Sequence, residues 1–533
     1  MAESLESAKA NQCLKDFKGN TDPKVEKIRI EKSKDRLLTD CFSWLPEDRD
    51  FRHWKDSDDA QLLWIKGDPG KGKTMMMIAL VNELSAPIEK SPKPPILSYF
   101  FCQSTEPRLR SATSVLRGLI YMLASQQRSL IRHMLKRCDD AEKGIFEGES
   151  AIYTLQSILL DMLNDSNLRR TYFLVDALDE CGIQLRELLE TIAYEIPPAA
   201  TRVKWIVSSR NRPEIEEYLG RDGVWKKISL ELNSGHISRG VDVYIDSKVD
   251  QLARSKRYSH SLKTEVNSQL REKAEGIFLW VHLACKRLEK VSLLGTKREL
   301  KCIPRGLNTL YKRTINQVMD QDKFEAELCK NILCSAAVAY RPLRFQEIIS
   351  FLSLPEGHGC DNQALIDIIE RCGSFLAIRQ ETIYFIHQSA KDYFVSGDGR
   401  TILPFNEVNE HSKIIHRSLA IMPHYLRKDM YDLEKQGDIA EIPLIDRYDG
   451  PLVPIKYMCH YWVKHLISYN DSGTARDDRI LSDDGEIHKF LQKHFLHWIE
   501  ALALLGQLVE GVLMIKDLES KIDVGIPQRS ARL

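Results

Sequence analysis

The chain has 533 residues, and its 76 Lys and Arg side chains balance 76 Asp and Glu side chains, so the formal net charge is zero. This balance argues against a general nucleic-acid binder, which carries a basic excess. The basic run 254–263 is therefore interpreted as a solvated face. The twelve cysteines form no C-x-x-C pair and no zinc-like cluster, which indicates free thiols.

Residues 1–55 are polar with helical periodicity, and we expect an N-terminal helical segment there. The first residues contain neither the apolar core of a signal peptide nor a glycine for myristoylation. The apolar stretch 495–515 carries Glu500 and Glu510, so it is predicted to be a core helix. We therefore expect a cytoplasmic protein without a membrane span.

The sequence GDPGKGKT at residues 67–74 fits the phosphate-binding pattern G-x-x-x-x-G-K-[ST] (Walker A). It follows the apolar run 62–65 and precedes a helix-like run, which is the strand–loop–helix context that the pattern requires. We expect the loop and the start of the helix to bind the phosphates of a nucleotide through Gly67, Asp68, Pro69, Gly70, Lys71, Gly72, Lys73, Thr74 and Met75.

Each part of this loop has a chemical role. Gly67 and Gly72 are expected to let the backbone turn tightly, so that successive N–H groups form an anion nest. Lys73 is expected to reach the β- and γ-phosphates, and the Thr74 hydroxyl to ligate Mg²⁺. Lys71 either adds charge near the phosphates or is an exposed side chain.

Five β-like runs alternate with helical segments between residues 56 and 232, which predicts a parallel, doubly wound α/β sheet and a nucleotide-binding domain. The runs are 61–65, 96–102, 171–178, 203–210 and 225–230. Two of them, 171–178 and 203–210, are almost continuously apolar, as strands buried on both faces are. The fold class is therefore expected to be that of a P-loop NTPase with a five-stranded sheet.

Acidic and basic side chains follow the third and fourth of these runs. Asp176 ends an apolar strand and suits the Walker B carboxylate of the Mg²⁺ shell. Asp179 and Glu180 are candidate catalytic residues that orient or deprotonate water, although Asp179 also fits a turn or helix cap. Arg210, the third candidate catalytic residue, is expected at the ligand-binding edge of the sheet. There it senses the γ-phosphate or stabilises charge during transfer, or else forms a surface salt bridge.

The second half of the chain is predominantly helical by pattern. We expect a helical lid at 233–320, a winged-helix domain at 321–400 and a C-terminal helical domain at 401–533. The winged-helix prediction depends on two short β-like pieces, SFLAIRQ and TIYFIHQ, which flank Glu381.

Several motifs occur together in an order that resembles NACHT-type P-loop NTPases of the STAND class, in particular fungal vegetative-incompatibility (HET-type) and NLR-like proteins. The motifs are LLTDCFSWL, LLWIKGDPGKGKTMM, FLVDALDEC, WIVSSRNRPEI and FIHQSAKDYF. The resemblance implies a NACHT nucleotide-binding domain at 56–232, followed by the lid, winged helix and second helical domain.

The resemblance also implies further nucleotide contacts. His387 matches the winged-helix histidine that touches the β-phosphate of a bound diphosphate in such proteins. The segment 27–38 falls where relatives pack the base and ribose, and it supplies Arg29 and Ile30 as cofactor-binding candidates.

The function expected from these observations is a molecular switch that binds ATP or GTP with Mg²⁺ and hydrolyses it slowly. Its partners would be the nucleotide and either copies of itself or other NACHT-containing proteins. Because roughly 55 residues precede the first strand and the sequence stops near the end of the second helical domain, we expect neither a full signalling domain nor terminal sensor repeats. That expectation favours the alternative of a non-hydrolysing, nucleotide-bound scaffold. A small-molecule kinase shares the loop but fits the helical half badly.

Overall fold

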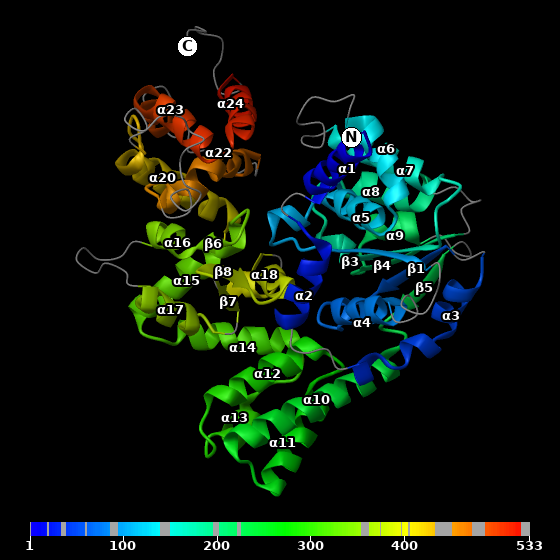
Figure 1. Ribbon diagram of the computed structural model, residues 1–533. Helices are drawn as coiled ribbons and strands as arrows, with labels where there is room; N and C mark the ends of the chain where they lie inside the picture. Colours follow the sequence, from blue (N-terminus) through cyan, green and yellow to red (C-terminus); the bar gives the residue numbers. More distant parts are fainter. Residues whose placement is uncertain are drawn as a thin grey trace. The chain divides into compact units, whose positions relative to one another are not determined.

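The computed structural model describes residues 2–18, 21–33, 39–58, 61–85, 94–138, 150–195, 202–220, 225–352, 362–373, 375–395, 397–402, 406–431, 450–471 and 485–523 (Figure 1). The chain forms two compact units, residues 1–310 and 311–533. The domain boundaries expected at residues 56, 233, 321 and 401 stay predictions, and each unit is described here by itself.

The first unit contains a five-stranded sheet whose strands all run parallel. Its strands are β1 (Leu62–Lys66), β2 (Ile96–Phe101), β3 (Thr171–Asp176), β4 (Val203–Ser209) and β5 (Lys226–Ser229). Their order in the sheet is β2-β3-β4-β1-β5, so β4 separates the strand before the phosphate loop from the strand that ends at Asp176. The predicted α/β fold with five parallel strands is confirmed.

Helices cover both faces of this sheet, with α4 on one face and α5 on the other in Figure 1. Because both faces are covered, every residue of β2, β3 and β4 is buried, and these strands are largely apolar on both sides. The Phe173 and Trp205 rings stack with centroids 4.4 Å apart in the core. The helices of this part are α1 (Ala2–Lys18), α2 (Pro23–Ser33), α3 (Arg49–Asp56), α4 (Lys73–Ser85), α5 (Ala112–Gln126), α6 (Ile131–Cys138), α7 (Ala151–Leu163), α8 (Leu185–Glu190) and α9 (Pro213–Leu219).

After β5 the first unit continues as a group of helices. They are α10 (Ser234–Lys256), α11 (His260–Lys273), α12 (Phe278–Lys290) and α13 (Thr296–Cys302), and α14 (Leu307–Met319) spans the boundary between the two units. Apolar residues at helical spacing on α10 and α11, such as Ile245, Val249, Val266 and Leu270, are buried where these two helices pack.

The second unit begins with helices around a small antiparallel sheet of order β6-β8-β7. The strands are β6 (Leu343–Arg344), β7 (Leu376–Arg379) and β8 (Thr382–Phe385), and the helices are α15 (Lys323–Val338), α16 (Phe345–Phe351), α17 (Asn362–Arg371), α18 (Gln388–Val395) and α19 (Gly399–Ile402). The strands β7 and β8 form the hairpin expected around Glu381, and Gln380 and Glu381 both take the positive φ of a tight two-residue turn.

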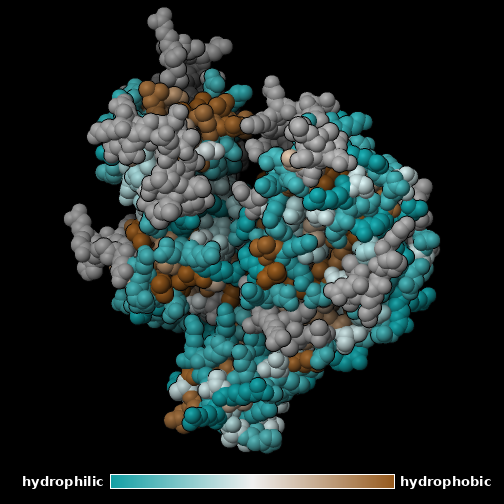
Figure 2. All heavy atoms as spheres, in the orientation of Figure 1, coloured by the Kyte–Doolittle hydropathy of each residue, from teal (hydrophilic) through white to brown (hydrophobic). Residues whose placement is uncertain are grey.

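After residue 405, the described residues form the long helices α20 (Glu407–Tyr425), α22 (Lys456–Asp471), α23 (Glu486–Leu504) and α24 (Leu508–Asp523). Trp462 and Trp498 pack edge to face in their core, with ring centroids 5.5 Å apart. Apolar side chains are exposed on α23 and α24: Leu496, Leu508, Val509, Val512 and Leu513. Figure 2 shows brown surface over this part of the molecule. Over the parts of the chain that the structure describes, no helix has the length and hydropathy needed to cross a membrane.

Candidate nucleotide-binding site

The phosphate loop joins β1 to α4, and its glycines serve two different purposes. Gly70 and Gly72 have φ values of +81° and +86°, a left-handed conformation that glycine adopts without strain. Gly67 lies outside that region, so the expectation that it serves a tight turn needs correction. A Cβ at Gly67 would lie 2.9 Å from the Cβ of Leu230, so this position requires glycine because the chain passes close to its neighbour.

Lys73 is the first residue of α4, and its ammonium folds back over the loop. It donates to the carbonyl oxygens of Gly67 at 2.5 Å and Asp68 at 3.0 Å. Burial lowers the pKa of Lys73, an effect that neighbouring Asp179 opposes and neighbouring Arg210 reinforces. The ammonium is therefore partly desolvated, among charges of both signs, and held by two carbonyls of the loop it belongs to.

The rest of the loop is contacted by a residue that follows β5, and the loop leads into the first turn of α4. Glu231 follows β5, accepts a hydrogen bond from the Asp68 backbone N–H at 2.7 Å and another from the Ser229 hydroxyl at 3.0 Å. Pro69, Thr74 and Met75 are half-buried. The first N–H groups of a helix have no partners within it, so the start of α4 provides donors and a positive dipole end for an anion.

Asp176 is the last residue of β3, and it is 2% exposed. Its Oδ1 accepts a hydrogen bond of 2.5 Å from the Ser208 hydroxyl, whose oxygen in turn accepts from the Ala177 backbone N–H at 2.9 Å. Ala177 has a φ of +55°, which is unfavourable for a residue with a Cβ and redirects the chain sharply after the strand. Neighbouring strands β3 and β4 thus fix this carboxylate at the edge of the sheet.

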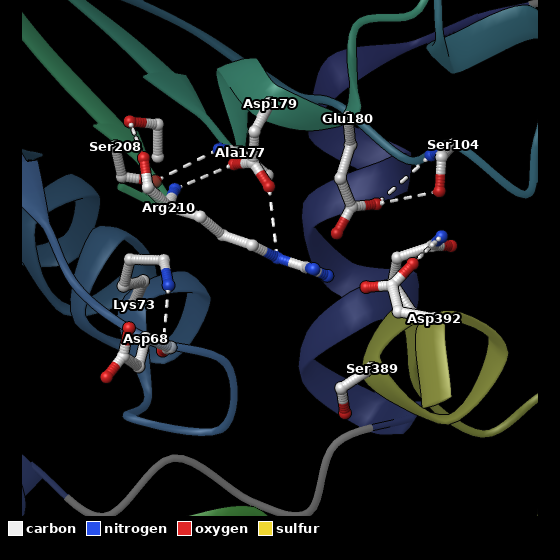
Figure 3. Close-up of polar contacts among 12 residues, drawn as sticks. Asp68, Lys73, Ser104, Ala177, Asp179, Glu180, Ser208, Arg210, Ser389 and Asp392 are labelled. Carbon is white, nitrogen blue, oxygen red and sulfur yellow. Dashed lines mark hydrogen bonds and ion pairs between the residues drawn. The ribbon is translucent and has the colours of Figure 1, made fainter. Parts of the chain in front are cut away.

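Asp179 and Arg210 form a close pair at the same edge, as Figure 3 shows. The Asp179 Oδ1 accepts from the Arg210 backbone N–H at 3.0 Å, and its Oδ2 lies 3.1 Å from the Arg210 Nε. The side chains are 3% and 15% exposed, respectively, so the pair is largely shielded from water. Both oxygens of Asp179 therefore contact Arg210, and the geometry supports a role in holding this guanidinium.

Glu180 turns away from Asp179 toward the loop that follows β2 (Figure 3). Its Oε2 accepts from the Ser104 backbone N–H at 3.1 Å and from the Ser104 hydroxyl at 3.4 Å. The two neighbouring carboxylates that the sequence offered as candidate catalytic groups therefore bind to different parts of the chain.

Thr74 and Asp176 supply a hydroxyl and a carboxylate, the hard oxygen ligands that Mg²⁺ prefers. Among the described residues there is no group of three or more His, Cys, Asp or Glu side chains arranged to hold a metal ion. Mg²⁺ usually keeps several waters and shares its shell with substrate phosphates, so this small set of protein ligands fits an ion that binds together with a nucleotide.

The candidate base-binding residues lie on α2. The Arg29 Nε pairs with Glu26 at 2.6 Å, and its Nη2 donates to the Gln103 side chain at 2.6 Å. Ile30 is buried. Residues 34–38 of the predicted base-binding segment lie outside the described residues, and the base-binding role of Arg29 and Ile30 stays a prediction.

His387 belongs to the second unit, where it follows β8. The Ser389 backbone N–H donates to the His387 Nδ1 at 3.0 Å, and the Ser389 hydroxyl lies 2.8 Å from the same nitrogen. Because Nδ1 accepts from a backbone amide, a neutral imidazole at this position carries its hydrogen on Nε2. The phosphate contact of His387 stays a prediction.

Sequence reasoning missed Glu231, Ser104 and Ser208 as parts of this site. All three follow or end parallel strands, and the carboxyl ends of parallel strands meet at one edge of the sheet. The same rule predicts Arg210 at this edge and also points to these three side chains.

Three features define a P-loop NTPase fold here. They are a parallel sheet, a glycine loop leading into a helix that begins with a lysine, and a buried aspartate at the end of β3, which one strand separates from β1. Residues 40–210 match the family model described as Nephrocystin 3, N-terminal.

Over 526 residues, 96% of its length, the chain is 41% identical to the vegetative incompatibility protein HET-E-1 of Podospora anserina. The matched region covers 38% of that relative. The predicted resemblance to NACHT-type P-loop proteins of fungal vegetative incompatibility is confirmed.

Two solved structures align with this chain at lower similarity. The Walker-type ATPase PABY2304 of Pyrococcus abyssi has a TM-score of 0.33 and 14% identity, covering 70% of this chain and 99% of its own. The structure of Drosophila ORC bound to DNA has a TM-score of 0.32 and 11% identity, covering 64% of this chain and 93% of the matched chain.

Proposed function

We propose that the protein is a nucleotide-dependent switch that binds ATP or GTP together with Mg²⁺ and hydrolyses it slowly. The observation that carries the proposal is Lys73, whose ammonium is held over the phosphate loop by two carbonyl oxygens. On binding, Lys73 exchanges these carbonyls for oxygens of the β- and γ-phosphates. Its partly desolvated surroundings strengthen the attraction to an anion.

In this proposal the metal and the γ-phosphate are held at the carboxyl edge of the sheet. Thr74 and Asp176 hold Mg²⁺, which neutralises phosphate charge when bound. Ser208 keeps the Asp176 carboxylate in place through its 2.5 Å hydrogen bond. Arg210 binds the γ-phosphate, and Asp179 orients the guanidinium through the backbone N–H and Nε contacts.

The positions of the two candidate catalytic carboxylates support the proposal that hydrolysis is slow. Asp179 accepts from Arg210 through both oxygens, and Glu180 accepts from Ser104. Either carboxylate has to give up or share these contacts before it orients water, which disfavours rapid turnover. The same contacts favour the second candidate function, a scaffold that holds nucleotide without hydrolysing it.

The switch itself requires that one conformation prefers the diphosphate and another the triphosphate. His387 is the proposed reporter of the diphosphate, since the tautomer set by Ser389 leaves Nε2 as the ring's donor nitrogen. Similarity to a vegetative incompatibility protein supports a role in fungal incompatibility or NLR-like signalling. The triphosphate form is proposed to assemble in the cytoplasm with copies of itself or with other NACHT-containing proteins.

Substitution of Lys73 tests the site. We expect Lys73→Ala to weaken binding of fluorescent ATP and ADP about 100-fold, because it removes charge-assisted hydrogen bonds to two phosphates. Lys290→Met is the matched control, since Lys290 is exposed at the end of α12 and its loss should leave affinity unchanged. Equal affinity of wild type and Lys73→Ala would contradict the assignment.

Phosphate release distinguishes the switch from the scaffold. A wild-type rate clearly above that of Lys73→Ala supports the switch. Tight binding of triphosphate without release above that background supports the scaffold. Parallel titrations with ATP and GTP identify the base that the site prefers.

A further inference from the structure

The turn at residues 274–277, between α11 and α12, has at its centre a residue that disfavours the conformation of the turn. The Ile277 backbone N–H donates to the Ala274 carbonyl at 2.9 Å, and the two central residues, Glu275 and Gly276, have φ values of +51° and +66°. Two consecutive positive φ values define a type I′ turn, which favours Asn and Gly at its centre. Glu275 has a Cβ that opposes this conformation, so the turn needs support from outside.

That support comes from the phosphate loop. The Lys71 Nζ donates to the carbonyl oxygens of Glu275 at 3.3 Å and Gly276 at 3.2 Å, the two central residues of the turn. A Cβ added at Gly276 would lie 3.6 Å from this nitrogen, so the ammonium sits directly against the turn. Lys71 is therefore directed toward the turn that precedes α12.

The residues that follow the turn rest on the glycines of the same loop. The Leu279 backbone N–H donates to the Gly70 carbonyl at 3.4 Å. A Cβ at Gly70 would come within 2.8 Å of the Ile277 side chain, and one at Gly72 within 3.0 Å of the Phe278 ring. Because close packing leaves no room between them, a displacement of the turn has to be accompanied by a change around Gly70 and Gly72.

We propose that Lys71 is a positioning residue that pins the 274–277 turn and thereby keeps the phosphate loop in its binding conformation. The proposal rests on the proposed nucleotide site and adds to it a means by which the lid helices control nucleotide release. When the hydrogen bonds of Lys71 break, the strained turn changes conformation and the start of α12 becomes more mobile. The left-handed conformations of Gly70 and Gly72 then lose the side chains that pack against them. A loop that must reorder before it binds phosphate binds more weakly and releases faster.

The first test measures the turn in the full-length protein without added nucleotide. We expect Lys71→Met to accelerate hydrogen exchange of the Ile277 and Leu279 amides on the order of fivefold, the effect of losing a typical hydrogen bond. Lys290→Met lies at the opposite end of α12 and should leave these amides unchanged. Circular dichroism on each variant checks that the fold is retained.

The second test uses a rescue. Glu275→Asn places a residue that tolerates positive φ in the turn, so the turn should hold its conformation without the lysine. We expect Lys71→Met to speed release of a fluorescent ADP on the order of fivefold, and the double variant Lys71→Met/Glu275→Asn to return most of the way to the wild-type rate. Rescue in both the release rate and the amide exchange supports the proposal.

Other outcomes overturn it. If Lys71→Met weakens ADP binding while the Ile277 and Leu279 amides keep their protection and Glu275→Asn restores nothing, Lys71 acts as a phosphate ligand. If the amides of the turn exchange equally in wild type and Lys71→Met, the turn does not depend on the lysine. If the wild-type protein binds neither ATP nor ADP, the proposed function is wrong. The hydrogen-exchange measurement still tests the contact between Lys71 and the turn in that case.

Discussion

Two groups of buried or half-buried polar side chains, one in each unit, differ in how their hydrogen bonds are satisfied. At the carboxyl edge of the sheet the polar groups are Lys73, Asp176, Asp179 and Arg210, which carry full charges and come from separate stretches of the chain. We refer to these four residues as the phosphate edge. Among the described residues, the Lys73 ammonium donates to two loop carbonyls at the distances given above, and phosphate oxygens can replace these contacts.

The second group lies in the C-terminal helices and consists of His411, His465, Tyr457 and Tyr340, which we call the histidine cluster. The Nδ1 atoms of His411 and His465 are 2.7 Å apart, and the Tyr457 hydroxyl lies 2.8 Å from the His465 Nε2. The Tyr340 backbone N–H donates to the Tyr457 hydroxyl at 3.0 Å. Burial lowers the pKa of His411 and holds the pKa of His465 well below its ordinary value, so these rings are neutral and satisfy one another.

The comparison shows why burial of polar groups does not by itself identify a ligand site. The phosphate edge gathers charges of both signs around a loop whose backbone N–H groups suit an anion, and the carbonyl contacts of its lysine can be exchanged for phosphate oxygens. The histidine cluster is a set of mutual hydrogen bonds between α20, α22 and the chain after α15, extended by contacts of the Tyr340 hydroxyl with the Lys464 carbonyl and the Ser468 hydroxyl. Such networks serve to fix packing. The first group should therefore respond to nucleotide and the second to pH.

The largest expected effect is acid destabilisation of the C-terminal helices. Burial lowers the pKa of His460 on α22 to about 4, and Lys464, Arg341 and Lys456 add to this, while Gln507 opposes it. The unfolded chain takes up the proton near the ordinary value of 6.5, so the stability is present above that pH and is lost as the pH falls toward 4. For His460 alone we expect a loss of about 2 kcal/mol between pH 7 and pH 5.

Hydrogen exchange of the α22 amides, corrected for the intrinsic effect of pH, measures this loss in the full chain. His460→Phe removes the titrating group and should make α22 less sensitive to acid by the same amount. Unchanged protection of α22 in the wild type between pH 7 and pH 5 would contradict the lowered pKa of His460.

We expect a smaller effect, on the preference for ATP over ADP, when the ion pair at the phosphate edge is substituted. Arg210→Met should reduce the preference for ATP over ADP about tenfold, because it removes a charged donor to the γ-phosphate. Asp179→Asn should reduce it about threefold, since a neutral amide holds the guanidinium less firmly. Competition titrations with both nucleotides give the two ratios.

Arg212→Met is the matched control, because Arg212 is exposed two residues after Arg210. This variant should keep the wild-type ratio of ATP affinity to ADP affinity. The assignment of Arg210 to the γ-phosphate is wrong if its loss leaves the ratio of the two affinities intact, whatever happens to affinity itself.

The sequence predicted the local parts of this molecule well. Every one of the five expected strands lies within one or two residues of its observed bounds, since each is a short apolar run bounded by turns or polar segments. The glycine loop and the position of Asp176 were predictable for the same reason, because a motif within a strand–loop–helix unit fixes its own geometry.

Contacts between distant segments were not predictable in this way. The pairing of Asp179 with Arg210 depends on the sheet order, which puts β3 beside β4, and nothing near either residue encodes that order. The contact of Lys71 with Glu275 joins residues about 200 positions apart. A pattern within one sequence shows that Lys71 is in the phosphate loop, but only the packed structure shows that it is directed toward the turn before α12.

The central claim is that the loop at residues 67–74 holds a nucleotide, and one measurement tests it most directly. Purified wild-type protein is denatured, and any released nucleotide is identified and quantified by chromatography and mass spectrometry, with Lys73→Ala prepared in parallel. The account predicts close to one adenine or guanine nucleotide per wild-type chain and very little from the variant. Equal amounts from both proteins, or none from wild type even after incubation with Mg²⁺ and ATP or GTP, would contradict it.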